Sequence, residues 1–193
     1  MSLLDKGSKR NLKDTKIGKI IYYQSGLLAL YCVYATVFAH PHAIMYRGLF
    51  TMSLVALAMI RYSTPGDKSG KIKTIDYVLA VLSLITGLYI ILSTERLVFR
   101  TPFFDPILPL DIVFGTIAIL LVLEATRRTV GYPLAIVALI MMAYTFFGKY
   151  IPGMFGHRGF AFDRLIEQMF LTTNGIFGGS VGIASSYVLL FVI

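Results

Sequence analysis

Long apolar runs separated by short polar stretches dominate the chain. A transmembrane helix needs about 20 mostly apolar residues, and five runs approach that length before a sixth begins. The runs cover residues 20–39, 46–60, 75–92, 110–123 and 132–151, and the sixth extends from about residue 176 to residue 193. The pattern predicts an all-α polytopic membrane protein with about five complete transmembrane helices and the start of a sixth.

Residues 162–170 follow a different pattern. Phe162, Leu165, Ile166, Met169 and Phe170 recur at helical spacing, with polar residues on the opposite face. This predicts an amphipathic interfacial helix before the sixth span. The helix either lies on the outer membrane surface or docks on other spans, and the periodicity does not distinguish the two arrangements.

Composition agrees with a membrane location. Charged residues make up 15% of the 193 residues, whereas soluble domains carry about 25%. The formal net charge is +8, but Lys and Arg lie mainly in the head of the chain and in short stretches between apolar runs. That distribution excludes nucleic acid as the expected partner and favours a lipid bilayer. Alternate sides of the bundle receive twelve and six Lys and Arg residues, which predicts a cytoplasmic N-terminus.

Groups that carry out catalysis are not clustered in the sequence. No nucleophile–base pair, carboxylate dyad or set of metal ligands stands at a recognisable spacing, so we expect neither an enzyme nor a cofactor or metal site. Asp76 and Asp111 are placed at span starts, near the lipid headgroups. Glu124 precedes Arg127 and Arg128 by three and four residues, a helical spacing that predicts structural ion pairs. No acidic residue is placed in mid-membrane, so a proton relay is not expected.

The most distinctive polar segment stands at the entry to the sixth span. Its candidate residues are Thr172, Thr173, Asn174, Gly175, Gly178, Gly179 and Ser180. One interpretation is an irregular, glycine-permitted backbone beside a solute path. The other is close helix packing through the Gly175/Gly179 and Gly178/Gly182 spacings, with a helix start at Thr173 or Asn174. Both interpretations remain open at the level of sequence.

Several ordered strings resemble one family of transporters. They are residues 111–115 (DIVFG), 123–135 (LEATRRTVGYPLA), 150–153 (YIPG), 157–160 (HRGF) and 171–178 (LTTNGIFG). From about residue 111 onward the chain resembles the fused permeases of tripartite ATP-independent periplasmic (TRAP) transporters, in the subgroup that works with TAXI-type binding proteins. The sequence departs from the family at Asn174, where an acidic residue is usual.

The resemblance implies a secondary active permease for an organic acid or an amino acid. A periplasmic solute-binding protein would deliver the solute, and a sodium or proton gradient would drive uptake across the cytoplasmic (inner) membrane of a bacterium or archaeon. Residues 1–19 would form a basic cytoplasmic segment, residues 20–129 a four-helix Q-type domain, and residues 130–193 the beginning of a truncated M-type permease domain. The coupling-ion and substrate sites of the family lie beyond residue 193, so no binding residue is carried over.

Two further expectations accompany this assignment. The alternative function is a stand-alone accessory membrane subunit that stabilises a larger permease without transporting solute itself. The outer arginines Arg96, Arg100 and Arg158 either contact the binding protein or are solvated loop ends.

Overall fold

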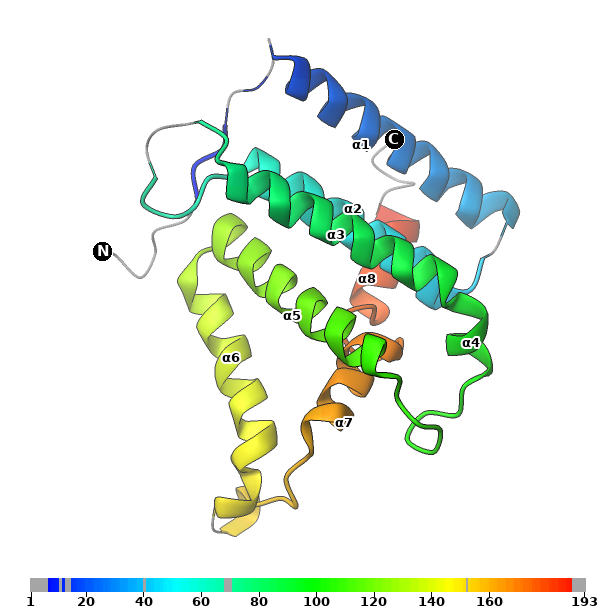
Figure 1. The fold of residues 1–193 in the computed structure, drawn as a ribbon, viewed down its shortest axis with the longest axis vertical. Helices are drawn as coiled ribbons and strands as arrows, with labels where there is room; N and C mark the ends of the chain where they lie inside the picture. The colour runs from blue at the N-terminus through cyan, green and yellow to red at the C-terminus, as the bar shows by residue number, and fades with distance from the viewer. Residues whose placement is uncertain are drawn as a thin grey trace.

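Five long helices dominate the structure, a computed structural model that describes residues 7–10, 12, 15–39, 41–67, 71–151 and 153–188 (Figure 1). They are α1 (Lys16–Tyr34, continued by the π-helical turn η1, Ala35–Ala39), α2 (Ala43–Arg61), α3 (Thr74–Leu92), α5 (Pro109–Thr129) and α6 (Tyr132–Phe147, continued by the 3-10 turn η2, Gly148–Tyr150). Each is long and apolar enough to cross a membrane. The predicted all-α polytopic membrane fold is therefore confirmed.

Shorter elements connect and follow these spans. They are α4 (Thr94–Phe99), η3 (Gly153–Phe155), α7 (Phe162–Ile166), the π-helical turn η4 (Glu167–Leu171), α8 (Gly179–Ile183) and the π-helical turn η5 (Ala184–Val188). The sixth apolar run thus becomes helical at Gly179, a few residues later than predicted. Residues 189–193, on which the expected truncation rests, lie outside the described residues, as does most of the basic segment before residue 15.

Helices α2 and α3 form the most extensive helix pair of the bundle. Two glycines face the partner helix at this contact. A Cβ added to Gly48 would lie 2.9 Å from Ile90 Cγ2, and one added to Gly87 would lie 3.1 Å from Met52 Cβ. The hydroxyl of Ser83 also donates a hydrogen bond to the Met52 carbonyl, at 2.7 Å. Small residues and an interhelical hydrogen bond are the means by which helices associate in lipid.

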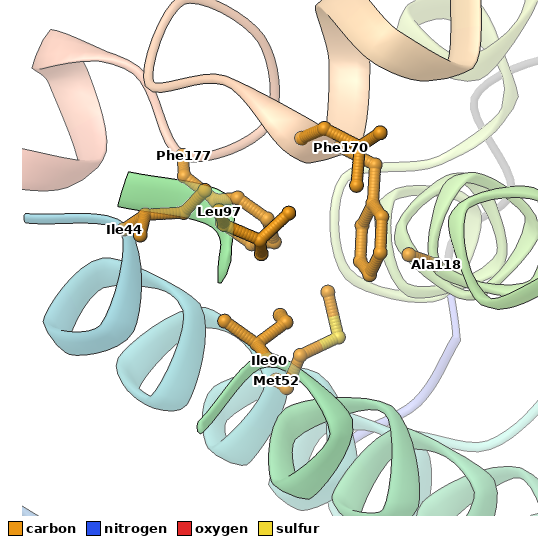
Figure 2. Packing of buried hydrophobic residues seen from close by; sticks show 8 residues of the cluster. Ile44, Met52, Ile90, Leu97, Ala118, Phe170 and Phe177 are labelled. Carbon is orange, nitrogen blue, oxygen red and sulfur yellow. The ribbon is translucent and has the colours of Figure 1, made fainter. Parts of the chain in front are cut away.

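Helix α5 packs beside this pair, and the principal core lies where they meet α4 and the segment after α7 (Figure 2). The buried members of this core are Ile44, Met52, Ile90, Leu97, Ala118, Phe170, Leu171 and Phe177. The outward faces of the spans keep large apolar side chains exposed, among them Leu88, Leu120 and Ile140. In a bilayer these side chains would contact lipid, so their exposure carries no penalty.

The amphipathic segment docks on α5. The side chains of Leu165, Ile166 and Phe170 are buried, and α5 contributes a glycine beneath them. A Cβ added to Gly115 would lie 2.5 Å from Ile166 Cγ2, so only glycine leaves room for the docked segment. The docked arrangement is therefore the one that the structure adopts.

Helix α6 leaves the bundle after a tight turn. The backbone N–H groups of Val130 and Gly131 both donate to the Thr126 carbonyl, at 2.9 and 3.2 Å. Gly131 has a φ of 112°, a conformation that side chains with a Cβ disfavour. Beyond this turn α6 diverges from α5 (Figure 1), and 11% of its apolar window is buried. Its large exposed apolar face is available to lipid or to further protein.

Candidate functional site

The chain unwinds between η4 and α8, at the polar segment that the sequence singled out. The backbone is non-helical from Thr172 to Gly178. The Thr172 hydroxyl donates to the Gln168 carbonyl at 2.9 Å, and the Ile176 N–H donates to the Met169 carbonyl at 2.9 Å. These bonds satisfy two backbone carbonyl groups of η4 that lack partners within the helix, as capping groups do at helix ends. The arrangement is an interrupted helix beside the core of the bundle.

The candidate residues of this segment do not form one polar cluster. Thr172 is buried, Thr173, Gly175 and Gly178 are partly buried, and Asn174, Gly179 and Ser180 are exposed. A Cβ on Gly175 would lie 2.5 Å from the Gln168 carbonyl oxygen, so this position requires glycine. Around Gly179 nothing lies within 4 Å of an added Cβ, so it is not a close-packing position. The predicted helix start at Thr173 or Asn174 is wrong, because α8 begins only at Gly179.

Arg47 of α2 reaches this interrupted segment. Its Nη1 donates to the carbonyl of Phe177 at 3.2 Å, and Phe177 is fully buried. A Cβ added to Gly182 would lie 2.8 Å from Arg47 Cζ, so the guanidinium lies directly against α8. From the sequence alone, Arg47 is one of the six Lys and Arg residues placed on the outer side of the bundle. The available signal was an arginine inside an apolar run, which is costly in a membrane unless it has a role.

Arg47 keeps donors that the described residues do not use. It is half-buried, and among the described residues no carboxylate lies within salt-bridge distance of it. A guanidinium carries five N–H donors in a planar fork that matches a carboxylate. The segment therefore places a cation beside unwound backbone at the edge of the bundle.

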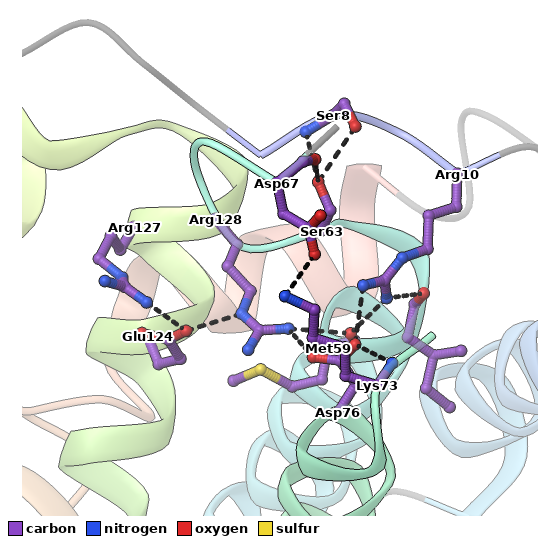
Figure 3. A network of polar contacts seen from close by, with 11 residues as sticks. Ser8, Arg10, Met59, Ser63, Asp67, Lys73, Asp76, Glu124, Arg127 and Arg128 are labelled. Atoms are coloured by element: carbon purple, nitrogen blue, oxygen red, sulfur yellow. Dashed lines mark hydrogen bonds and ion pairs between the residues drawn. The ribbon is translucent and has the colours of Figure 1, made fainter. Parts of the chain in front are cut away.

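A buried charge network lies at the opposite end of the bundle (Figure 3). Asp76 accepts from Arg10 Nη2 at 2.7 Å, from Arg128 Nη1 at 2.6 Å and from the backbone N–H of Lys73 at 3.0 Å. The side chains of Arg10 and Asp76 are 0% exposed and that of Arg128 is 2% exposed. Asp76 lies in the first turn of α3, at the span start where the sequence placed it, and it is the centre of an internal ion-pair network.

Glu124 extends the network along α5. It accepts from Arg127 Nη2 at 2.8 Å and from Arg128 Nε at 2.7 Å, the two contacts expected from their spacing. Arg10 and Arg128 also donate to carbonyls at the end of α2, those of Ile60 at 2.9 Å and Met59 at 3.2 Å. The network therefore joins the N-terminal segment to α2, α3 and α5.

Asp111 forms a second ion pair at the end of the bundle away from Asp76, where α5 begins. Its carboxylate accepts from Arg96 at 2.6 and 2.8 Å and from the Tyr89 hydroxyl at 2.5 Å. The Tyr89 ring stacks on Phe114, with ring centroids 4.2 Å apart. Like Asp76, Asp111 is fully buried rather than exposed to the headgroups. Arg96 is therefore tied to Asp111, although 35% of its side chain remains exposed.

Glu167 makes a third charged contact at the same end. It accepts from Arg100 Nη2 at 2.7 Å, from the Phe103 N–H at 2.8 Å and from Arg164 Nη1 at 2.8 Å. Burial alone would raise the pKa of Glu167, but these donors outweigh it and the pKa lies below its ordinary value. The periodicity placed Glu167 on a polar, solvent-facing side, whereas its side chain is 0% exposed. Arg100 is likewise tied into the fold, and Arg158 is the outer arginine of the predicted set that remains exposed.

These contacts limit the chemistry of the described part of the chain. Its fully buried carboxylates, Asp76, Asp111 and Glu167, are each paired with arginine, and no group of three His, Cys, Asp or Glu side chains that could hold a metal occurs there. A buried carboxylate that is paired with arginine is compensated in place, an arrangement suited to a structural brace.

Comparisons with known proteins identify no relative of this chain. No family model, no curated protein and no solved structure matches it.

Proposed function

We propose that this chain is the N-terminal part of a secondary active TRAP-type permease that takes up an organic acid or an amino acid. In this proposal a periplasmic binding protein delivers the solute and a sodium or proton gradient drives uptake. The N-terminus lies in the cytoplasm, and the rest of the M-type domain packs against the exposed face of α6.

The interrupted helix after Leu171 is the observation that carries the proposal. Transporters build solute sites from discontinuous helices, in which unwound backbone is tolerated because it faces protein or a water-filled cavity. Here the unwound stretch from Thr172 to Gly178 lies against the guanidinium of Arg47, which keeps N–H donors that the described residues do not use. The substrate site that the resemblance implies lies beyond residue 193, so in this proposal the segment and Arg47 line the path of a solute that carries a carboxylate. The resemblance in residues 111–178 supports the same assignment.

The accessory-subunit alternative is favoured by a different observation. The buried carboxylates of the described residues are locked in arginine pairs at both ends of the bundle, which is typical of a rigid brace. A brace would stabilise a larger permease without contacting its solute.

Uptake in proteoliposomes separates the two functions. The chain is co-reconstituted with the remainder of the permease and a solute-binding protein, and uptake of radiolabelled organic acids and amino acids is measured under an imposed sodium or proton gradient. We expect that uptake requires the gradient, the binding protein and this chain, and that Arg47→Gln reduces it at least tenfold. The control variant Lys71→Gln, which removes an exposed cation from the predicted cytoplasmic side, should leave uptake unchanged.

Other outcomes would decide against the proposal. If omission of the chain lowers only the amount of folded permease, while uptake per folded molecule persists, the accessory function is correct. If uptake of every solute tested is independent of the chain and of both gradients, both functions are excluded.

A further inference from the structure

A cavity of about 710 Å³ lies between the start of α1, the N-terminal segment and the end of α2. Its volume is within the range of about 300–1,000 Å³ that is usual for small-molecule sites. Ile21, Tyr22 and Tyr23 of α1 form its apolar and aromatic wall. It is separate from the interrupted helix, and nothing in the proposed transport function uses it.

The cavity opens because α1 is attached to the bundle mainly through its second half. Leu28, Cys32 and Ala35 are buried against Tyr46 and Phe50 of α2. No comparable cluster of buried apolar residues is found for the first turns of α1 within the described residues. Within the described residues, the beginning of α1 therefore leaves an open space beside α2.

Positive charge surrounds this space. Four cationic side chains line the cavity, those of Lys9, Arg10, Lys19 and Arg61, and no acidic residue of the described chain is among its lining residues. The charge of Arg10 is balanced by Asp76. The other three side chains are exposed, and no carboxylate of the described residues lies within salt-bridge distance of them. Among the described residues, the positive charge on this side of the cavity is therefore uncompensated.

The opposite side of the entrance is suited to lipid. Tyr22 and Tyr23 are 74% and 72% exposed, and their rings meet edge to face with centroids 5.9 Å apart. Leu27, one turn further along α1, is 72% exposed. Tyrosines at the start of a span, followed by exposed apolar residues, are typical of a membrane interface passing into hydrocarbon. A ligand in this cavity would contact cations at one end and an acyl-chain environment at the other.

We propose that this cavity binds one anionic phospholipid. The lipid phosphate interacts with Lys9, Lys19 and Arg61, and its acyl chains lie along the exposed face of α1. Basic pockets between transmembrane helices recognise anionic headgroups in this way, and each Lys or Arg near the lipid contributes about fivefold in affinity. The lipid fills the space between α1 and α2 and fastens the start of α1 to the bundle.

Tryptophan quenching by brominated lipid tests the proposal on the full chain. The chain contains no tryptophan, so Tyr22→Trp introduces a single reporter at the entrance of the cavity. The variant is reconstituted into phosphatidylcholine vesicles that contain increasing fractions of dibrominated phosphatidylglycerol or dibrominated phosphatidylcholine. We expect quenching to saturate at a low mole fraction of phosphatidylglycerol and to rise only in proportion to brominated phosphatidylcholine.

Paired substitutions that remove positive charge test which residues produce the preference for phosphatidylglycerol. In the reporter background, Lys19→Gln with Arg61→Gln should weaken the preference for phosphatidylglycerol about 30-fold. The control pair Lys149→Gln with Arg158→Gln removes the same charge from exposed residues at the other end of the bundle and should leave the preference unchanged. The charge-conserving pair Lys19→Arg with Arg61→Lys should also retain it, which separates loss of charge from loss of folding.

Three results would overturn the proposal. Equal quenching by the two brominated lipids would show that the entrance has no anionic specificity. An equal loss of preference in the control pair would assign the effect to net charge alone. Relief of quenching by millimolar inorganic phosphate would identify a site for a soluble anion instead of a lipid.

Discussion

Replacement of Asp76 by Asn tests the buried charge network most directly. Asp76 lies between Arg10 and Arg128, and all three side chains are at most 2% exposed. The substitution keeps the size of the side chain but removes the negative charge that compensates both guanidinium groups. We expect the variant to insert into the membrane and to fold, with a large loss of stability.

The magnitude follows from the burial of the partners. Removing one member of a buried ion pair costs about 3–5 kcal/mol, because the other charge is left uncompensated. Asp76 serves two arginines, but the two losses do not add, since Glu124 still accepts from Arg128 Nε at 2.7 Å and Asn can still accept one hydrogen bond. We therefore expect a total loss of about 3–5 kcal/mol, or a lowering of Tm by about 6–20 °C on the scale for chains of this size.

Thermal unfolding in detergent measures this loss by circular dichroism. Cys32 is the single cysteine of the chain and is 0% exposed, so its reaction with a thiol-specific dye provides a second probe. Asp163→Asn is the matched control, because Asp163 is exposed and forms no ion pair with the described residues; its effect should stay within about 0.5 kcal/mol. Addition of Arg10→Gln to Asp76→Asn should cost less than the sum of the two single changes. An Asp76→Asn variant as stable as the wild type would refute the assignment of this network as a brace.

Three further predictions concern the docked segment, its charge and the topology. Gly115→Ala should be about 1–3 kcal/mol less stable than Gly26→Ala, whose added methyl group meets nothing within 4 Å, and equal stabilities in thermal unfolding would contradict the docking of the amphipathic segment on α5. Because the folded-state pKa of Glu167 is lowered, the ionised side chain stabilises the fold above its ordinary pKa of 4.5, and this contribution is lost as pH falls through the folded-state pKa. Glu167→Gln should therefore remove this part of the loss of stability in acid. A variant whose stability has the same pH profile as the wild type would contradict this role of Glu167. With the native cysteine replaced, membrane-impermeant thiol reagents should label Lys71→Cys and Arg158→Cys from opposite sides, and labelling from one side would overturn the order of the spans.

The individual spans were predictable because the signal for them is local. The bilayer sets the length of an apolar helix, and that length is visible in a single stretch of sequence. The runs at residues 46–60 and 110–123 were predicted too short, since α2 covers Ala43–Arg61 and α5 covers Pro109–Thr129. The residues missed at the start of α2, 43–45, are apolar, whereas those missed at the end of α5 form a polar and charged turn. The turn in α5 remains helical because buried partners satisfy its side chains, as Arg128 illustrates. Hydropathy alone does not register such compensation.

The Glu124 contacts were visible for the same reason, since a helix places residues three and four positions apart on one face. The segment 172–180 was singled out by its composition, but the sequence left irregular backbone and close helix packing both open. The unwinding of this segment depends on the close approach of Gly175 to the Gln168 carbonyl, and that contact forms only when both halves of the turn are folded.

The sequence by itself therefore determined that the chain is a bundle of membrane helices and where each of them lies. Only the tertiary structure decided which charges meet. Arg10 and Arg128 reach Asp76 across 66 and 52 residues of chain, and Arg47 reaches Phe177 across 130. The physical reason is that hydrophobicity and helical period are properties of a segment, whereas the compensation of a buried charge depends on which helix ends the fold brings together.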